Sequence, residues 1–266
     1  MADAPPIIEL KDLSRAFDGY PVLRNLSLAF PEGLTTVVMG PSGCGKSVML
    51  KHIIGLLRPD SGEVWFRKNR VDTMTENELS KLRRQFGMLF QQAALFESMN
   101  VRENTAFPMH EAEWEQDRID ARVHEVLSLL GLADTKDKMP AELSGGMRKR
   151  IGLARAIVLA PEVILYDEPT TGLDPIRADV INELILRLNE KLGVTSIVVT
   201  HDLVSAYKVA DYMVLLHNGR VHLAGTPDVF RASTDPIVVG FLEGQAASAE
   251  LLENPTTQPC EERTSA

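Results

Sequence analysis

An α/β fold is the class that the sequence predicts, and three observations predict it. The glycine-rich stretch 40–47 follows an apolar strand-like run, 35–39, and opens a helical pattern that extends to Leu57. A second apolar run, 163–166, ends in two carboxylates, as a buried strand of a parallel sheet does. Between these units, the pattern changes to helices over residues 100–160, which places a helical subdomain at about 92–160. We therefore expect a parallel core sheet with an inserted α-helical subdomain.

The composition narrows the class of protein. At 266 residues the chain can bury one core, or one core plus a subdomain. The net charge of -9 argues against a nucleic-acid partner held by bulk positive charge. The two cysteines, Cys44 and Cys260, form neither a disulfide framework nor a metal cluster, which favours a reducing compartment. We expect no signal peptide and no membrane span, because no run approaches the roughly 18 apolar residues that spanning requires. A membrane role would therefore depend on a partner.

The first strands indicate a β-hairpin. Strand-like runs at 7–10 and 22–28 flank Asp18-Gly19, which is a hairpin-type turn signal. Phe17 stands just before that turn, where its ring could stack on adenine or could equally fill the core. Later runs at 63–66 and 86–90 also predict strands, and the second delivers Gln91 at its end.

Residues 40–47 fit the phosphate-binding pattern G-x-x-x-x-G-K-[ST]. The strand before it and the helix after it supply the context that the motif requires, so a plain glycine-rich turn is the weaker interpretation. The glycines let backbone N–H groups wrap a phosphate, and the helix N-terminus adds positive potential. Lys46 can reach the β- and γ-phosphates of a nucleotide, and the Ser47 hydroxyl can ligate Mg²⁺. The predicted cofactor-binding residues of this loop are Gly40, Pro41, Ser42, Gly43, Cys44, Gly45, Lys46 and Ser47.

Cys44 lies within this loop at the start of a helix. A helix N-terminus can lower the pKa of a thiol, so we expect Cys44 to favour the reactive thiolate. The alternative is that Cys44 is simply a small residue that fits. Alkylation of this thiol would then separate the two interpretations.

The helical region contains a second candidate anion site. Residues 119–130 keep one apolar face before Gly131, which indicates an amphipathic helix of the inserted subdomain. Ser144 is a plausible N-cap for a helix that runs to about Ala160. Gly145 and Gly146 at its start leave backbone N–H groups exposed, and such groups bind anions. A lone Ser-Gly-Gly is weak evidence by itself.

The acid pair after the run 163–166 is the strongest candidate for catalysis. Asp167 can help to hold Mg²⁺, which P-loop enzymes require. Glu168 can orient or deprotonate a water for in-line attack on a γ-phosphate. The alternative, a solvated strand end, is weaker because an acid pair that follows a P-loop is what phosphoryl transfer requires.

The last third of the chain predicts a capped helix, a strand and a hairpin. Asp174 and Pro175 start the helix, and capping alone accounts for Asp174. Its expected buried stripe consists of Val180, Leu184, Leu188 and Leu192, before a stop at Gly193. The strand 194–200 places His201 at the same sheet edge as Lys46 and Asp167. A hairpin follows over 211–224, and residues 244–266 form a polar tail.

Taken in order, these motifs resemble the ATP-binding subunit of an ABC transporter, over residues of about 7–243. The resemblance implies a P-loop nucleotide-binding domain with an antiparallel β subdomain and an inserted α-helical subdomain, which binds ATP and Mg²⁺. It implies that Phe17 stacks on adenine, that Gln91 links Mg²⁺ and the attacking water to the membrane partner, and that His201 contacts the γ-phosphate. It also implies a head-to-tail dimer in which Ser144, Gly145 and Gly146 bind the γ-phosphate of the ATP held by the other subunit, and in which Asp174, which matches the D-loop, belongs to the nucleotide site. The catalytic set would then be Glu168, His201 and Gln91, with Ser47, Gln91 and Asp167 at the metal.

Two short segments make the resemblance narrower. The signature is Leu143-Ser-Gly-Gly-Met147, where the commoner form has glutamine in place of Met147. With the segment 90–101, it is similar to the ATPases of the Mla/Mce phospholipid-transport systems. This resemblance implies an integral-membrane permease, lipid-binding and small accessory subunits, no nucleic acid, and a place on the cytoplasmic face of the inner membrane. The alternatives are the ATPase of a polar-metabolite importer and a soluble ABC ATPase without a transport role.

Overall fold

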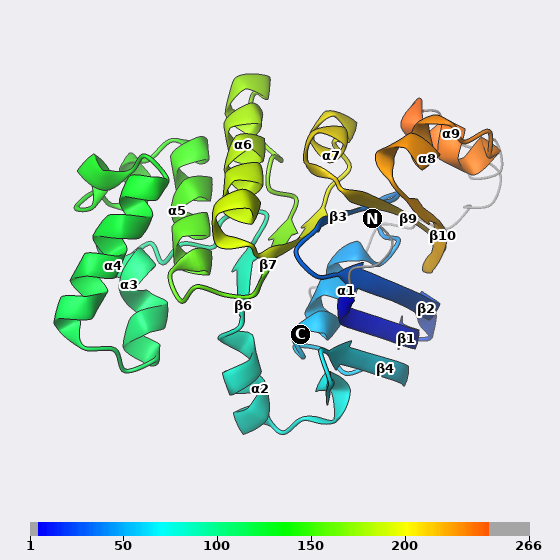
Figure 1. The fold of residues 1–266 in the computed structure, drawn as a ribbon, viewed down its shortest axis with the longest axis horizontal. Helices are drawn as coiled ribbons and strands as arrows, with labels where there is room; N and C mark the ends of the chain where they lie inside the picture. Colours follow the sequence, from blue (N-terminus) through cyan, green and yellow to red (C-terminus); the bar gives the residue numbers. More distant parts are fainter. Residues whose placement is uncertain (1–4, 245–266) are drawn as a thin grey trace, which may run out of the picture.

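A computed structural model describes residues 5–244, and its centre is a six-stranded sheet (Figure 1). The five strands from β9 to β6 are parallel, and β10 joins β9 as an antiparallel hairpin at one edge. The order across the sheet is β10 (Arg220–Gly225), β9 (Tyr212–His217), β3 (Thr35–Met39), β8 (Thr195–Val199), β7 (Val163–Asp167) and β6 (Phe86–Leu89). The sequence prediction of a parallel core sheet is confirmed.

A second sheet is antiparallel and lies beside helix α1 (Lys46–Ile53) (Figure 1). Its order is β2 (Tyr20–Pro31), β1 (Pro6–Phe17), β4 (Ser61–Phe66) and β5 (Asn69–Arg70). Asp18 and Gly19 form the turn of the β1–β2 hairpin, and both have positive φ, of 50° and 82°. A turn of this kind favours glycine and aspartate for that reason. The predicted antiparallel β subdomain is therefore present.

The inner strands of the core sheet, β3, β7, β8 and β9, are buried on both faces, which explains the continuous apolar runs in the sequence. In β3, Val37 packs into one hydrophobic cluster and Val38 into the other. The first cluster contains buried side chains of the helices α3 to α6, and the second contains those of α1 and of the antiparallel sheet. Successive side chains of a strand point to opposite faces, so a strand between two layers has no solvent side.

The helices fall into an inserted group and a group that covers the core sheet (Figure 1). The inserted group precedes β7, and Asn100 and Ser144 cap its helices α3 and α5. The helices after α1 are α2 (Glu76–Arg83), α3 (Val101–Glu111), α4 (Gln116–Leu129), α5 (Gly145–Ile157), α6 (Pro175–Leu192), α7 (Leu203–Val209), α8 (Pro227–Arg231) and α9 (Pro236–Leu242). Three 3-10 turns are η1 (Val71–Thr73), η2 (Ala133–Thr135) and η3 (Pro140–Glu142).

The buried face of α6 differs from the predicted stripe. Val180 and Leu192 are 45% and 40% exposed, whereas Ile181 and Ile185, which were not predicted, are buried. Leu184 and Leu188 are buried as expected. A strict spacing of four residues drifts around a helix of 3.6 residues per turn, so a stripe drawn at that spacing leaves the core at both ends.

The described part of the chain ends within the expected tail. Gly244 is described, and the rest of the predicted polar segment 244–266 lies outside the described residues. Among residues 5–244, no helix combines the length and apolar character needed to cross a membrane.

Candidate functional site

The glycine-rich loop joins β3 to α1 at the carboxyl edge of the core sheet, where parallel α/β folds bind ligands. Gly40 has a φ of 149°, and a Cβ there would stand 2.3 Å from the carbonyl oxygen of Leu216. Only glycine fits, because the loop passes directly over the backbone of β9. The Lys46 ammonium folds back over the loop and donates to the carbonyls of Gly40 and Pro41, at 2.7 and 2.9 Å.

Ser47 and Asp167 meet across the sheet edge although 120 residues separate them. The Ser47 hydroxyl donates to the Asp167 carboxylate at 3.0 Å. Burial raises the pKa of Asp167, the neighbouring Glu168 charge raises it further, and the Ser47 hydrogen bond opposes both. A hydroxyl and a carboxylate are hard oxygen donors of the kind that Mg²⁺ prefers, so the pair fits a magnesium ion.

Glu168 is held from several sides. Its N–H donates to the carbonyl of Val199, and its carboxylate accepts the Thr171 hydroxyl at 3.0 Å. A ring nitrogen of His201 lies 2.9 Å from the same carboxylate. The Glu168 side chain is 13% exposed and the His201 ring 66%, so the histidine shields the acid from solvent on one side. A carboxylate in such a setting can bind and orient one water.

Two other predicted residues, Gln91 and Phe17, lie at or just after the end of a strand. Gln91 is exposed and follows β6, the strand next to β7. Phe17 is 37% exposed at the end of β1, and the Arg15 guanidinium covers its ring at 4.9 Å. Phe17 is therefore not core filler, and the adenine-stacking role stays a prediction.

The Ser144 turn and Asp174 form a separate place in the molecule. Ser144 caps α5 by accepting the N–H of Met147 at 3.3 Å, and Asp174 caps α6 by accepting that of Arg177 at 3.0 Å. The glycines of the turn lie against Leu173 and Arg177 rather than against the P-loop. Within one chain, the structure thus brings Lys46, Ser47, Asp167, Glu168 and His201 together, and it puts the signature turn beside the start of α6.

The expectation for Cys44 is wrong. The residue is 8% exposed, and burial raises the pKa of its thiol although the Lys46 charge opposes the shift. Its sulfur lies inside the loop, 2.7 Å from where a Cβ on Gly40 would stand. Removal of water from the thiolate outweighs the helix N-terminus, because the loop curls over the sulfur.

Sequence reasoning missed two residues of the centre, Thr171 and Lys149. Thr171 has no pattern that singles it out. Lys149 is buried and stands on α5 at the helical spacing of Gly146 and Leu153, which are also buried. A lysine at an apolar position of a helix was the signal that could have found it.

A phosphate-binding loop with an oxygen-donor pair beneath it and a shielded carboxylate at the same sheet edge defines a P-loop nucleoside triphosphatase. Residues 23–171 match the sequence model of the family described as ABC transporter. The chain belongs to this family and is an ATPase whose hydrolysis is coupled to transport.

Curated relatives cover most of the chain. It is 42% identical over 239 residues to the probable ribonucleotide transport ATP-binding protein mkl of Mycobacterium leprae, covering 90% of this chain and 69% of that protein. It is 39% identical over 241 residues to the intermembrane phospholipid transport system ATP-binding protein MlaF of Escherichia coli K12, covering 90% of each. Identity to MlaF of Haemophilus influenzae is 42%, over 90% of this chain and 91% of that one.

Solved structures agree with the fold. A dimeric post-hydrolysis state of the ATP-binding cassette MJ0796, bound to ADP and Pi, has a TM-score of 0.76 at 32% identity and covers 82% of this chain and 98% of that one. The cbiO1 protein of Clostridium perfringens, part of the ABC transporter complex cbiONQ, has a TM-score of 0.80 at 31% identity, over 89% of this chain and 95% of that one. The α/β fold with an antiparallel subdomain and a helical subdomain is therefore the ABC ATPase fold.

Proposed function

We propose that this chain powers an ABC transporter that moves phospholipids between bacterial membranes. The observation that carries the proposal is the similarity to the MlaF proteins, which extends over 90% of this chain and at least 90% of theirs. The signature with Met147 and the segment 90–101 favour the same class. The rival cargo is a polar metabolite. It is favoured by 42% identity to a protein named for ribonucleotide transport, although this chain covers only 69% of that relative.

The nucleotide site works as follows in this proposal. ATP phosphates bind the loop Gly40–Ser47, and the Lys46 ammonium exchanges its two carbonyl partners for phosphate oxygens. Ser47, Asp167 and Gln91 would hold Mg²⁺, which would neutralise charge on the phosphates. The exposed ring of Phe17 stacks on adenine, with its other face against Arg15.

Glu168 is the general base for hydrolysis. Its carboxylate orients a water in line with the γ-phosphate and takes up its proton. Thr171 and His201 restrict the carboxylate to one orientation, at 3.0 and 2.9 Å, so that little rearrangement is needed as the water attacks. His201, as the more exposed partner, also reaches the γ-phosphate.

A second copy of the chain completes each site. Ser144, Gly145 and Gly146 bind the ATP held by the partner's P-loop, and Asp174 lies at the same dimer interface. The separation of the signature turn from the P-loop within one chain supports this arrangement. The dimeric structures of the related MJ0796 cassette support it as well. Residues 7–243 form the nucleotide-binding domain of each copy.

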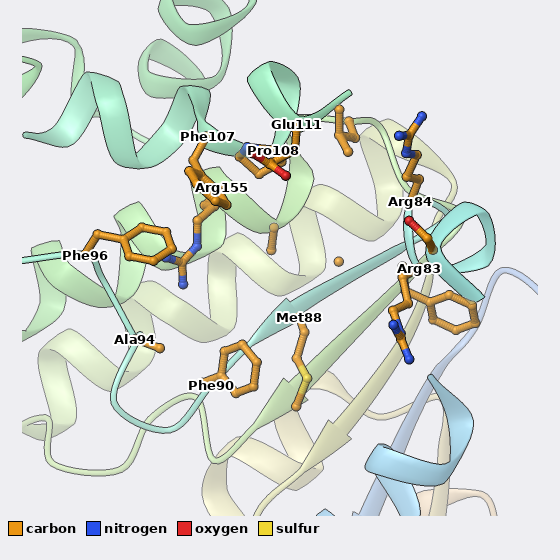
Figure 2. A pocket seen from close by; sticks show the side chains of 15 residues that line it. Arg83, Arg84, Met88, Phe90, Ala94, Phe96, Phe107, Pro108, Glu111 and Arg155 are labelled. Carbon is orange, nitrogen blue, oxygen red and sulfur yellow. The ribbon is translucent and has the colours of Figure 1, made fainter. Parts of the chain in front are cut away.

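The permease docks in a groove between the core and the helical subdomain of about 92–160. The groove encloses about 630 Å³. Figure 2 shows that its lining includes Phe90 and Phe96 on the segment after β6 and Phe107 of α3, together with the arginines Arg83, Arg84 and Arg155. Phe90 and Phe96 are each 39% exposed, which suits an apolar helix end of a partner. Docking there places the chain on the cytoplasmic face of the inner membrane, with lipid-binding and small accessory subunits in the same complex.

Reconstitution of the native complex in proteoliposomes tests the cargo. We expect ATP-dependent transfer of labelled phospholipid, and its loss with Glu168→Gln, which should slow turnover by at least about 100-fold while ATP stays bound. Transport of a ribonucleotide or another small polar solute without lipid transfer would reject the phospholipid cargo and leave the ATPase assignment intact.

The docking groove is tested with Phe96→Asp. We expect this chain to separate from the permease and to keep its own ATP binding, because the substitution removes the exposed aromatic ring that the partner would cover. Val229→Asp is the matched control, since Val229 is 44% exposed on α8. Helix α8 packs against β10, which is the edge strand of the core sheet at the side away from β6. Retention of the complex by Phe96→Asp, or its loss in both variants, would exclude this surface.

A further inference from the structure

Lys149 is a buried cation that none of the roles above uses. It lies on α5, five residues after the Ser144 cap, and is 5% exposed. Burial lowers the pKa of its ammonium, and the charges of Glu168 and Asp167 oppose that shift. Such a side chain is costly to bury unless hydrogen bonds compensate it, so its partners indicate what it stabilises.

The partners of Lys149 are two main-chain carbonyls of the candidate site. Its Nζ donates to the carbonyl of Gln91, in a short contact, and to that of Glu168 at 3.1 Å. Gln91 follows β6, and Glu168 follows the adjacent strand β7. Lys149 therefore joins the segment after β6 to the segment after β7. The first carries Gln91, which is expected at the metal, and the second carries Glu168, which is expected to orient the water.

The Glu168 backbone needs support of this kind. Its φ is 51°, in the left-handed region that a residue with a Cβ rarely adopts. The N–H of Glu168 donates to Val199, and its carbonyl accepts Lys149. The Glu168 carbonyl also accepts the N–H of Thr171 at 3.3 Å, so hydrogen bonds on both sides of the residue support this left-handed conformation.

We propose that Lys149 is a positioning residue for ATP hydrolysis. It holds the backbones of Gln91 and Glu168 at fixed relative positions, so that both side chains point to the γ-phosphate of the same ATP. This rests on the proposed roles of those two residues. Lys149 stands on the helix that begins at the signature turn, and it contacts Glu168 through the main-chain carbonyl of that residue.

The test measures steady-state ATP hydrolysis by the full-length chain with Lys149→Met, which keeps the buried aliphatic stem and removes the donors. We expect kcat to fall about 10- to 100-fold, as misplacement of a catalytic group does, with KM for ATP within about twofold of wild type. Lys149→Arg restores donors to both carbonyls and should recover most of kcat. Lys138→Met, at an exposed lysine, is the matched control and should keep wild-type kcat.

Three results would overturn the proposal. They are a kcat of Lys149→Met within about threefold of wild type, a loss of kcat/KM that comes from a raised KM, and a Lys149→Arg variant that is no more active than Lys149→Met. If Lys149→Met does not fold, Lys149→Gln, a shorter neutral donor, replaces it against the same criteria. Glu168→Gln separates this proposal from the general-base assignment. Rapid hydrolysis by Glu168→Gln would reject that assignment, whereas slow hydrolysis by Glu168→Gln together with a fast Lys149→Met would reject only the role of Lys149.

Discussion

Cys44 shows how the surroundings of one residue reverse the effect of its position in a motif. The raised pKa leaves less thiolate at any given pH, so alkylation at neutral pH should be slow and should accelerate as the pH rises. In a Cys260→Ser background, we expect maleimide to label Cys44 at least about tenfold more slowly at pH 7.5 than it labels a free cysteine of pKa about 8.5.

The loop geometry adds a second expectation for the same thiol. The sulfur lies 3.8 Å from the Lys46 ammonium, so the bulky adduct should abolish ATP binding and bound MgATP should protect Cys44. Mass spectrometry of the labelled peptide measures both effects. Fast labelling at neutral pH, or labelling that persists in saturating MgATP, would contradict this description of the loop.

Helix α6 illustrates what decides the face of an element. Ile185 is fully buried and Val180 is 45% exposed, although the regular spacing of apolar residues favoured Val180. Ile185→Ala should lower the free energy of unfolding by about 2–5 kcal/mol, because it removes buried methyl groups and leaves a cavity. Val180→Ala should change it by less than about 0.5 kcal/mol. Urea denaturation followed by circular dichroism compares them, and equal effects would contradict the observed orientation of α6.

At the scale of the whole molecule, the two halves of an active site are expected on different chains. Mixing Lys46→Ala chains with Ser144→Arg chains should give dimers with one intact composite site and one doubly damaged site, whereas both sites are damaged in either homodimer. Mixed dimers are isolated by dual-tag purification, and the number of ATP molecules trapped per dimer is then measured. Mixed dimers that trap no more ATP than the two homodimers would exclude the composite arrangement, or would show that the two sites work only together.

Local patterns were sufficient for most of the fold and for the centre of the site. Strands buried on both faces produce unbroken apolar runs, so β3, β7 and β8 were predictable without their neighbours. A P-loop combines glycine, lysine and hydroxyl at set spacings for reasons of backbone geometry and charge, and parallel strands bring their carboxyl ends to one edge. The positions of Lys46, Ser47, Asp167 and His201 at that edge followed from these rules.

The rest depended on contacts between segments that are distant in the sequence. The pKa of Cys44 is set by the loop that encloses it, and the buried face of α6 by the sheet beneath it. The pairing of Ser47 with Asp167, the shielding of Glu168 by His201, and the bridge from Lys149 to Gln91 and Glu168 each join different elements. By itself the sequence determined which elements form and which chemistry they carry, because those depend on local spacing. Burial and hydrogen-bond partners were decided only by the tertiary structure, because both arise where the elements pack.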